Sequence, residues 1–144
     1  MFVSDVLRQK SGEVITVYAT DKVSVAVGKL AEWRIGAVIV EDNRMHPVGI
    51  FSERDLVNAL ARSGGRVHDY EVRELMTSPF ISIRPDERVD AALALMTARR
   101  IRHLPIVEND RLVGVVSIGD LVKHRLDEKE KEASVLLDIS RMRG

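Results

Sequence analysis

The amino-acid sequence predicts an α/β (α+β) fold in which two β-α-β-β-α repeats pack sheet to sheet with pseudo-twofold symmetry. The first observation is internal similarity, because residues 15–17 return at 81–83 with the same apolar-polar-apolar order. The second is a longer likeness between residues 48–57 and 113–122, which share a Gly-x-x-Ser-x-x-Asp motif. Two copies of one supersecondary unit therefore occupy almost the whole chain.

The first half of each repeat is predicted from the spacing of its apolar residues. Alternation at period two predicts short, half-buried strands at 15–17 and 81–83. Apolar residues at three- and four-residue steps then predict an amphipathic helix in each copy. These residues are Val23, Val27, Leu30 and Ala31 in the first copy, and Val89, Ala92, Leu93 and Met96 in the second.

The second half of each repeat begins with an unbroken apolar run, at 37–40 in the first copy and at 104–107 in the second. Such runs suit strands that are covered on both faces. Pro105 has no N–H to donate, so we expect it at the start of its strand or on an edge. A further strand is expected at 48–51 and at 112–116, followed by helices that begin near Ser52 and Ser117.

The chain divides into four segments on this interpretation. Residues 1–62 form the first repeat with a lead-in, 63–71 a linker, 72–124 the second repeat, and 125–144 a C-terminal helix. The lead-in 3–7 resembles 72–76, and Ser63, Gly64 and Gly65 mark the linker. One unit of about 50 residues buries too little apolar surface to be stable alone, so the repeats must pack together. The tail helix carries an apolar stripe, which we expect to pack either on its own domain or on a neighbouring subunit; its residues are Val135, Leu136, Ile139 and Met142.

Composition excludes several classes of protein. The 144 residues include 22 Lys and Arg and 22 Asp and Glu, a formal net charge of zero, which disfavours nucleic-acid and membrane-surface binding. No apolar segment is long enough to span a bilayer, and the N-terminus lacks a signal-peptide pattern. The sequence has no cysteine, which excludes disulfides and thiolate chemistry and fits a reducing compartment. We expect a cytoplasmic protein.

The doubled Gly-x-x-Ser-x-x-Asp motif supports a structural and a functional interpretation. A serine at the start of a helix with an acid three residues later is a capping box, which satisfies free backbone N–H groups. The same helix start favours a phosphate, while the carboxylate one turn later can accept both hydroxyls of a ribose. Ser52 with Asp55, and Ser117 with Asp120, can therefore hold a nucleoside monophosphate as well as cap a helix.

Basic residues before the strand at 104–107 differ between the two copies. Arg102 and His103 lie directly against that strand, where they favour a role in binding phosphate. The first copy has Gly36 and Ala37 instead, and the glycine permits a close backbone approach. Two repeats related by a pseudo-twofold axis form two similar grooves between them. The sequence therefore predicts that these grooves differ in positive charge.

Enzymatic activity has little support in the sequence. The four histidines are His46, His68, His103 and His124, and their spacing matches no metal site. No P-loop, Rossmann fingerprint or nucleophile elbow is present. The alternative to a ligand-binding module is a dimerisation or interaction scaffold with vestigial grooves.

These residues together resemble a tandem pair of cystathionine β-synthase (CBS) domains, a Bateman module, of the stand-alone bacterial type. The resemblance rests on the two motif copies and on the segment 101–107, and it covers about residues 3–124. It implies a non-catalytic module that binds an adenosine-containing ligand, with AMP expected first and ADP, ATP, NAD or S-adenosylmethionine as alternatives. No catalytic cofactor and no metal are expected.

The resemblance also implies two grooves, each built across the repeats. One would use Ser52, Arg54, Asp55, Thr77, Ile81, Arg102, His103 and Pro105, and the other Thr16, Gly36, Ala37, Val38, Ser117 and Asp120. The groove of Asp55 contains the basic residues Arg54, Arg102 and His103, so we expect it to bind phosphate more strongly than the other groove. Nucleotide occupancy would change the angle between the repeats, and a homodimer of such pairs would transmit the change to a separate effector protein.

Overall fold

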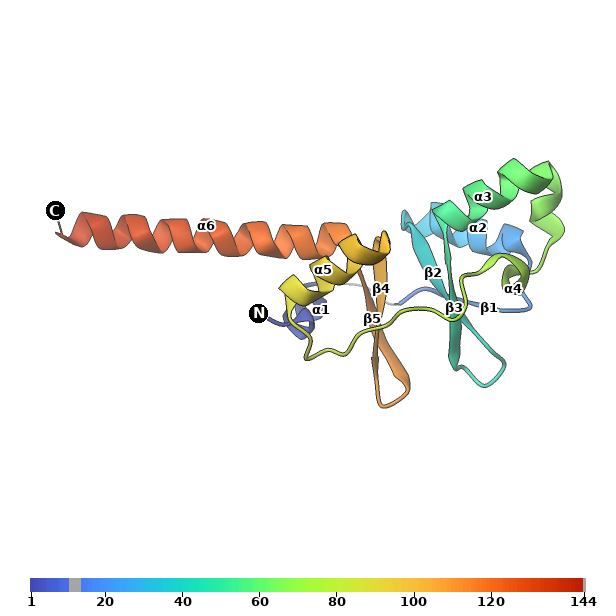
Figure 1. Ribbon diagram of the computed structural model, residues 1–144, viewed down its shortest axis with the longest axis horizontal. Coiled ribbons are helices and arrows are strands. Elements are labelled where there is room, and N and C mark those ends of the chain that lie inside the picture. The colour runs from blue at the N-terminus through green and yellow to red at the C-terminus, as the bar shows by residue number, and fades with distance from the viewer. Residues whose placement is uncertain (11–13, 144) are drawn as a thin grey trace.

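The computed structural model describes residues 1–10 and 14–143. Figure 1 shows two α/β units side by side, with a long C-terminal helix that extends away from them. The first unit contains β1 (Thr16–Tyr18), α2 (Val23–Trp33), β2 (Ala37–Glu41), β3 (Pro47–Ser52) and α3 (Glu53–Ser63). The second contains α5 (Val89–Arg99), β4 (His103–Glu108), β5 (Arg111–Ser117) and the start of α6 (Ile118–Arg143). Two lead-in helices, α1 (Val3–Gln9) and α4 (Val72–Leu75), and a 3-10 helix, η1 (Gly64–Asp69), complete the described elements.

The predicted order of elements is confirmed, with one difference in the second sheet. In the first sheet, β1 pairs in parallel with β2, which pairs antiparallel with β3. The second sheet has only β4 and β5, and the strand expected at 81–83 is reduced to a single bridge between Ile83 and Ile106.

Pro105 explains that difference. In the first sheet the N–H of Ile39 donates to the carbonyl oxygen of Ile15 at 3.2 Å. Pro105 occupies the equivalent place in β4 and has no N–H, so one rung of the ladder is lost. Its carbonyl oxygen still accepts a hydrogen bond from the Ile83 N–H at 3.1 Å. The proline therefore limits the pairing of β4 with residues 81–83, as expected for a proline at the edge of a sheet.

Each unit has its own core, which contains the apolar residues predicted from the helix spacing except Ala31, which is exposed. The core of the first unit includes Val23 and Leu30 from α2 and Phe51 from β3. The core of the second includes Met96 from α5 and Leu104 from β4. The two units thus have separately packed cores.

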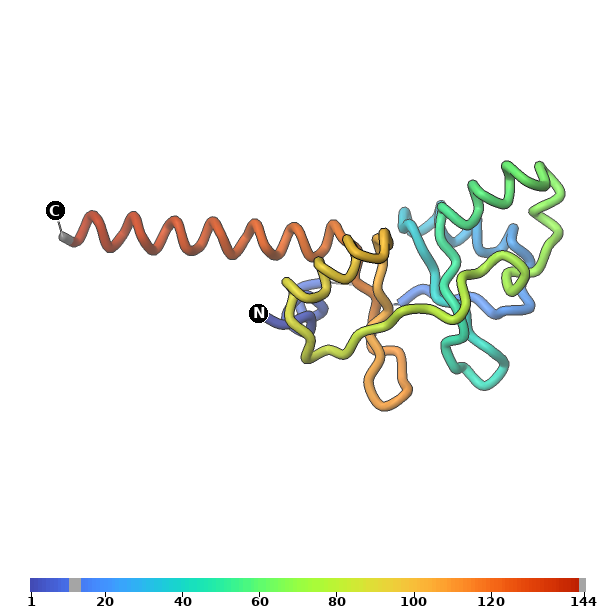
Figure 2. The backbone as a smooth tube through the Cα atoms, in the orientation of Figure 1, coloured from blue at the N-terminus to red at the C-terminus, as the bar shows by residue number. Residues whose placement is uncertain are grey.

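The lead-in helices are exchanged between the two cores. Val3 and Val6 of α1 are buried in the core of the second unit, whereas Val72 of α4 is buried in the core of the first. Backbone hydrogen bonds fix both contacts, from the Val3 N–H to the Glu87 carbonyl oxygen at 2.8 Å and from the Val72 N–H to the Asp21 carbonyl oxygen at 2.8 Å. The return of the chain from α4 to α5 can be followed in Figure 2. Neither unit completes its core without the other half of the chain.

The motif glycines are the points at which the lead-in segments approach the sheets. A Cβ atom at Gly49 would lie 2.6 Å from the Met76 sulfur and 3.0 Å from the Thr77 carbonyl oxygen. At Gly114 it would lie 2.7 Å from a terminal carbon of Leu7. The first glycine of each Gly-x-x-Ser-x-x-Asp motif is therefore required by packing.

The predicted linker and tail have more structure than their composition indicates. Within the linker, η1 buries Val67, which is only 1% exposed. The helix expected from residue 125 is continuous with the last helix of the second repeat, because α6 runs unbroken from Ile118. The apolar residues of its far end do not pack on their own domain: Val135, Leu136, Ile139 and Met142 are 42–85% exposed. No described helix is both long and apolar enough to cross a membrane.

We predict that alanine at three glycines has graded effects on stability. Gly49→Ala should lower the free energy of unfolding by about 2 kcal/mol, because the new Cβ meets backbone as well as a side chain. Gly114→Ala should cost less, because the end of the Leu7 side chain can rotate away. Gly28→Ala, in an open position within α2, is the control and should stabilise by about 0.5–1 kcal/mol.

Urea unfolding followed by circular dichroism measures all three variants. Equal destabilisation by Gly49→Ala and Gly28→Ala would contradict the close approach of the lead-in segment.

Candidate functional site

Both Ser/Asp pairs form the predicted capping boxes. At the start of α3 the Ser52 N–H donates to Asp55 Oδ2 at 2.9 Å, and the Asp55 N–H donates to Ser52 Oγ at 3.3 Å. At the start of α6 the Ser117 N–H donates to Asp120 Oδ2 at 2.8 Å, and the Asp120 N–H donates to Ser117 Oγ at 3.1 Å. The boxes hold each carboxylate half-buried at a helix start.

The strand register defines which residues of the two copies are equivalent. Ala37 pairs with Ser52, and His103 pairs with Ser117, so Ala37 corresponds to His103. The apolar runs 37–40 and 104–107, matched by sequence, are thus one residue out of register. A bulge lies at the equivalent place in both copies, after Val40 and after Ile106, so the shorter turn of the second copy accommodates the shift.

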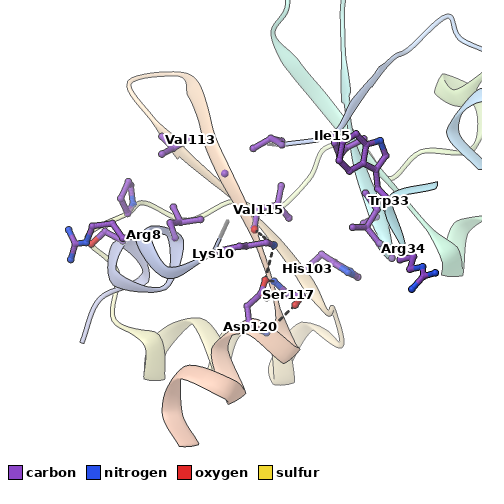
Figure 3. A pocket seen from close by; sticks show the side chains of 18 of the residues that line it. Arg8, Lys10, Ile15, Trp33, Arg34, His103, Val113, Val115, Ser117 and Asp120 are labelled. Carbon is purple, nitrogen blue, oxygen red and sulfur yellow. Dashed lines mark hydrogen bonds and ion pairs between the residues drawn. The ribbon is translucent and has the colours of Figure 1, made fainter. Parts of the chain in front are cut away.

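A cleft of about 810 Å³ lies between the two units, beside the carboxylate of Asp120. Figure 3 shows its lining, most of which comes from α1, the segment before β1, the end of α2, the start of β2, and β4, β5 and α6. Of the residues predicted for this groove, the cleft is lined by Gly36, Ala37, Ser117 and Asp120.

His103 also lines this cleft, although the sequence assigned it to the groove of Asp55. The reason is the alternation of β4: Leu104 points into the core of the second unit, so His103 points the opposite way, toward the first unit. A Cβ atom at Gly36 would lie 2.9 Å from His103 Cε1. The glycine therefore makes room for the imidazole ring.

The groove of Asp55 brings together fewer of its predicted residues. The Thr77 hydroxyl donates to Asp55 Oδ1 at 3.1 Å, which joins Ser52, Asp55 and Thr77 in one cluster. The Arg54 guanidinium donates to the Arg100 carbonyl oxygen at 3.0 Å. Of the remaining predicted residues, Ile81 packs against the second core and Pro105 is buried in β4. The Arg102 side chain is exposed, and its carbonyl oxygen accepts from the Ile118 N–H.

Two further residues predicted for the Asp120 groove, Thr16 and Val38, are not among those that line the cleft. Val38 is only 1% exposed and belongs to the core of the first unit. The Thr16 carbonyl oxygen accepts a hydrogen bond from Lys29 Nζ at 2.7 Å, and its neighbour Ile15 lines the cleft in its place. Trp33, the one tryptophan of the chain, also lines the cleft.

Lys10 is a cleft residue that the sequence analysis missed. Its Nζ lies 2.8 Å from Asp120 Oδ2 and 2.8 Å from the Val115 carbonyl oxygen. Nothing in the sequence links residue 10 to residue 120, because the contact arises only when α1 packs on the second unit. The one sequence signal for this contact is the likeness of residues 3–7 to 72–76, which predicts that the segment after each lead-in helix packs in a similar way in the two copies.

The cleft combines a charged carboxylate with a neutral imidazole. Burial disfavours the ionised form of Asp120, but hydrogen bonds from Lys10 and Ser117, together with the charge of Lys10, hold the pKa of its carboxyl below the ordinary value. Burial, reinforced by the charge of Lys10, lowers the pKa of His103. Among the described residues, no group of His, Asp and Glu is arranged to hold a metal ion.

Comparison with known proteins identifies the class to which this arrangement belongs. The CBS domain matches residues 3–62 and 72–127, so the chain belongs to the CBS-domain family and carries two copies of the domain. It is 34% identical over 112 residues to the uncharacterized protein MK0525 of Methanopyrus kandleri, covering 77% of this chain and 57% of that protein. The chain therefore spans little more than half the length of that relative.

Solved structures of CBS-domain pairs share the fold. The CBS-domain containing protein ATU1752 of Agrobacterium tumefaciens is 40% identical, with a TM-score of 0.83 over 86% of this chain and 92% of that one. The CBS-domain pair of protein MJ0100, solved with 5-methylthioadenosine and S-adenosyl-L-methionine, is 26% identical, with a TM-score of 0.78 over 89% and 98%. PAE2072 of Pyrobaculum aerophilum, solved with AMP, is 27% identical, with a TM-score of 0.74 over 83% and 89%.

We predict that removing the charge of Asp120 destabilises the protein in a pH-dependent way. Because the folded-state pKa of this carboxyl is lowered, its contribution is present above the unfolded pKa, about 3.9, and is lost as the pH falls through the folded pKa. Asp120→Asn should cost about 1 kcal/mol at pH 7, since the ion pair with Lys10 is partly exposed.

Urea unfolding at pH 7, 5 and 3 measures this dependence, with Asp138→Asn on the exposed end of α6 as the matched control. A cost of Asp120→Asn that stays constant down to pH 3 would show that the charge of Asp120 contributes nothing.

Proposed function

We propose that this chain is a non-catalytic regulatory module that binds an adenosine-containing nucleotide in the cleft of Asp120, with AMP as the first candidate. The observation that carries the proposal is the half-buried, ionised carboxylate of Asp120 at a helix start inside a cleft between two repeats. The related CBS-domain pairs solved with AMP and with S-adenosyl-L-methionine support the choice of ligand class. ATP, ADP and NAD contain the same adenosine group and are the alternatives.

The chemistry of each residue follows from its place in the cleft. Asp120 accepts hydrogen bonds from the ribose hydroxyls, while the Ser117 hydroxyl and the positive end of α6 favour a phosphate. Neutral His103 can donate one further hydrogen bond. Ile15 and Trp33 supply an apolar wall for the adenine ring.

A ligand in this cleft regulates by its effect on the two units. It contacts both of them, so it favours the relative arrangement for which its affinity is greater. The signal passes to a separate effector protein, and we place this process in the cytoplasm. Signal transduction of this kind needs no catalytic residue.

We further propose that the protein acts as a homodimer. Residues 129–142 of α6 are all exposed. An isolated helix of about 14 residues is only marginally stable in water. The apolar residues of this segment would be covered by the same helix of a second copy. The exposed Val57 and Leu60 of α3 add to the apolar surface available for such contacts.

We predict that adenosine nucleotides raise the unfolding temperature of the ligand-free protein. Thermal-shift measurements with AMP, ADP, ATP, NAD, NADH, S-adenosylmethionine and GMP test the whole ligand class. A ligand that binds only the folded state should raise the midpoint by several degrees at a concentration far above its Kd. The adenosine compounds should do so, and GMP should not.

Asp55→Ala and Asp120→Ala form a matched pair in the same assay, each compared with its own ligand-free midpoint. The shift with AMP should be smaller in Asp120→Ala than in Asp55→Ala. No shift with any compound at millimolar concentration would overturn the sensor and favour the dimerisation scaffold with vestigial grooves.

We predict a mass of twice 16.1 kDa in light scattering coupled to size-exclusion chromatography. Ile139→Glu should halve that mass, because it places a charge in the apolar stripe, whereas Ser134→Glu on another side of α6 should leave it unchanged. A monomeric wild-type protein would contradict the homodimer.

A further inference from the structure

The ammonium of Lys10 already occupies the carboxylate that a ribose would use. Asp120 Oδ2 accepts hydrogen bonds from the Ser117 N–H and from Lys10 Nζ, both at 2.8 Å. Lys10 also donates to the Val115 carbonyl oxygen at 2.8 Å, as the dashed lines in Figure 3 show. An ammonium has three protons, so one remains after these two contacts. A ligand that binds Asp120 must therefore share the carboxylate with a cation.

The pseudo-equivalent groove has a neutral group in the corresponding place. There the partner of the Asp55 carboxylate is the Thr77 hydroxyl, at 3.1 Å. Both partners come from the segment that follows a lead-in helix, Lys10 after α1 and Thr77 after α4. The lead-in exchange thus supplies a cation to one groove and a hydroxyl to the other.

The surroundings of Lys10 leave it able to reach an incoming ligand. Its side chain is 41% exposed, so solvent reaches the ammonium beside the cleft. The nearby guanidinium of Arg8 is paired with Asp5 on α1. Burial and the charge of Lys10 both lower the pKa of His103, which favours its neutral form. Arg34 also lines the cleft, but it belongs to the first unit and lies beside Trp33, across from Asp120 (Figure 3). Lys10 is therefore the cation best placed to meet the ligand where it contacts Asp120.

Sharing the carboxylate has different consequences for charged and neutral ligands. When ribose hydroxyls bind Asp120, the ammonium loses part of its contact with the carboxylate and needs another acceptor. A phosphate on the ligand supplies one, in the form of a charge-assisted hydrogen bond. A neutral nucleoside supplies none, so its binding weakens an ion pair without replacing it. The ammonium therefore discriminates in two ways, by a penalty on the neutral ligand and by a contact with the charged one.

We propose that Lys10 is the specificity-determining residue of the Asp120 cleft, and that it selects nucleotides with a phosphate over neutral nucleosides. This inference rests on the proposed function, since it assumes that adenosine compounds bind the cleft. It also reverses the order of the two grooves expected from the sequence, because it makes the Asp120 cleft the more selective for phosphate.

The test compares AMP with adenosine on three proteins: the wild type, Lys10→Met, and the control Lys123→Met on the exposed surface of α6. Methionine keeps most of the length of the lysine side chain and removes its charge. Kd values are taken from the movement of the backbone amide resonances of Ser117 and Gly119 in ¹⁵N NMR titrations, so that only the Asp120 cleft is read. The same spectra show whether each variant is folded.

The preference of the wild type for AMP over adenosine should fall about tenfold in Lys10→Met. AMP should bind more weakly, and adenosine equally well or more tightly. Lys123→Met should keep the wild-type preference.

An unchanged preference in Lys10→Met, or an equal loss of affinity for both ligands, overturns the role of Lys10 and leaves the proposed function intact. A wild-type protein whose Ser117 and Gly119 resonances respond to neither ligand overturns the proposed function, and this inference with it. If Lys10→Met does not fold, Lys10→Gln is measured in its place, with the same expectations.

Discussion

The exchange of the two lead-in helices is the contact on which the rest of the structure depends. Val72 fills the core of the first unit, although it begins the second repeat in sequence, while Val3 and Val6 fill the core of the second. Each unit is too small to be stable alone, and each also lacks part of its own core. The two units must therefore form together, which places the start of α6 beside a cleft that both units line.

The same exchange makes the two grooves different. Each returning segment passes close to a motif glycine and then reaches the nearest helix-start carboxylate, so its side chain becomes part of the site. One groove receives a hydroxyl, from Thr77, and the other an ammonium, from Lys10. The repeat architecture supplies two equivalent scaffolds, and a single residue on each lead-in segment sets their charge. This provides a simple way for a duplicated domain to bind two different ligands.

The sequence predicted what depends on short-range pattern, and missed what depends on packing between distant segments. The repeats, the helix faces and the capping roles of Ser52 and Ser117 follow from local spacing, and the structure agrees. The position of His103 depends on the register of β4. Matching the apolar runs 37–40 and 104–107 misaligned this strand by one residue. Lys10 could not be found at all, because its partner is 110 positions away in the sequence and is reached only through the helix exchange.

The central claim is that the exchanged lead-in segment and the motif of the second repeat form one nucleotide site. A crystal structure of the protein grown with AMP tests this most directly. We expect the ribose hydroxyls on the Asp120 carboxylate, with the phosphate within hydrogen-bonding distance of Lys10 Nζ. AMP bound only at Asp55, or in the Asp120 cleft with its phosphate directed away from Lys10, would contradict it.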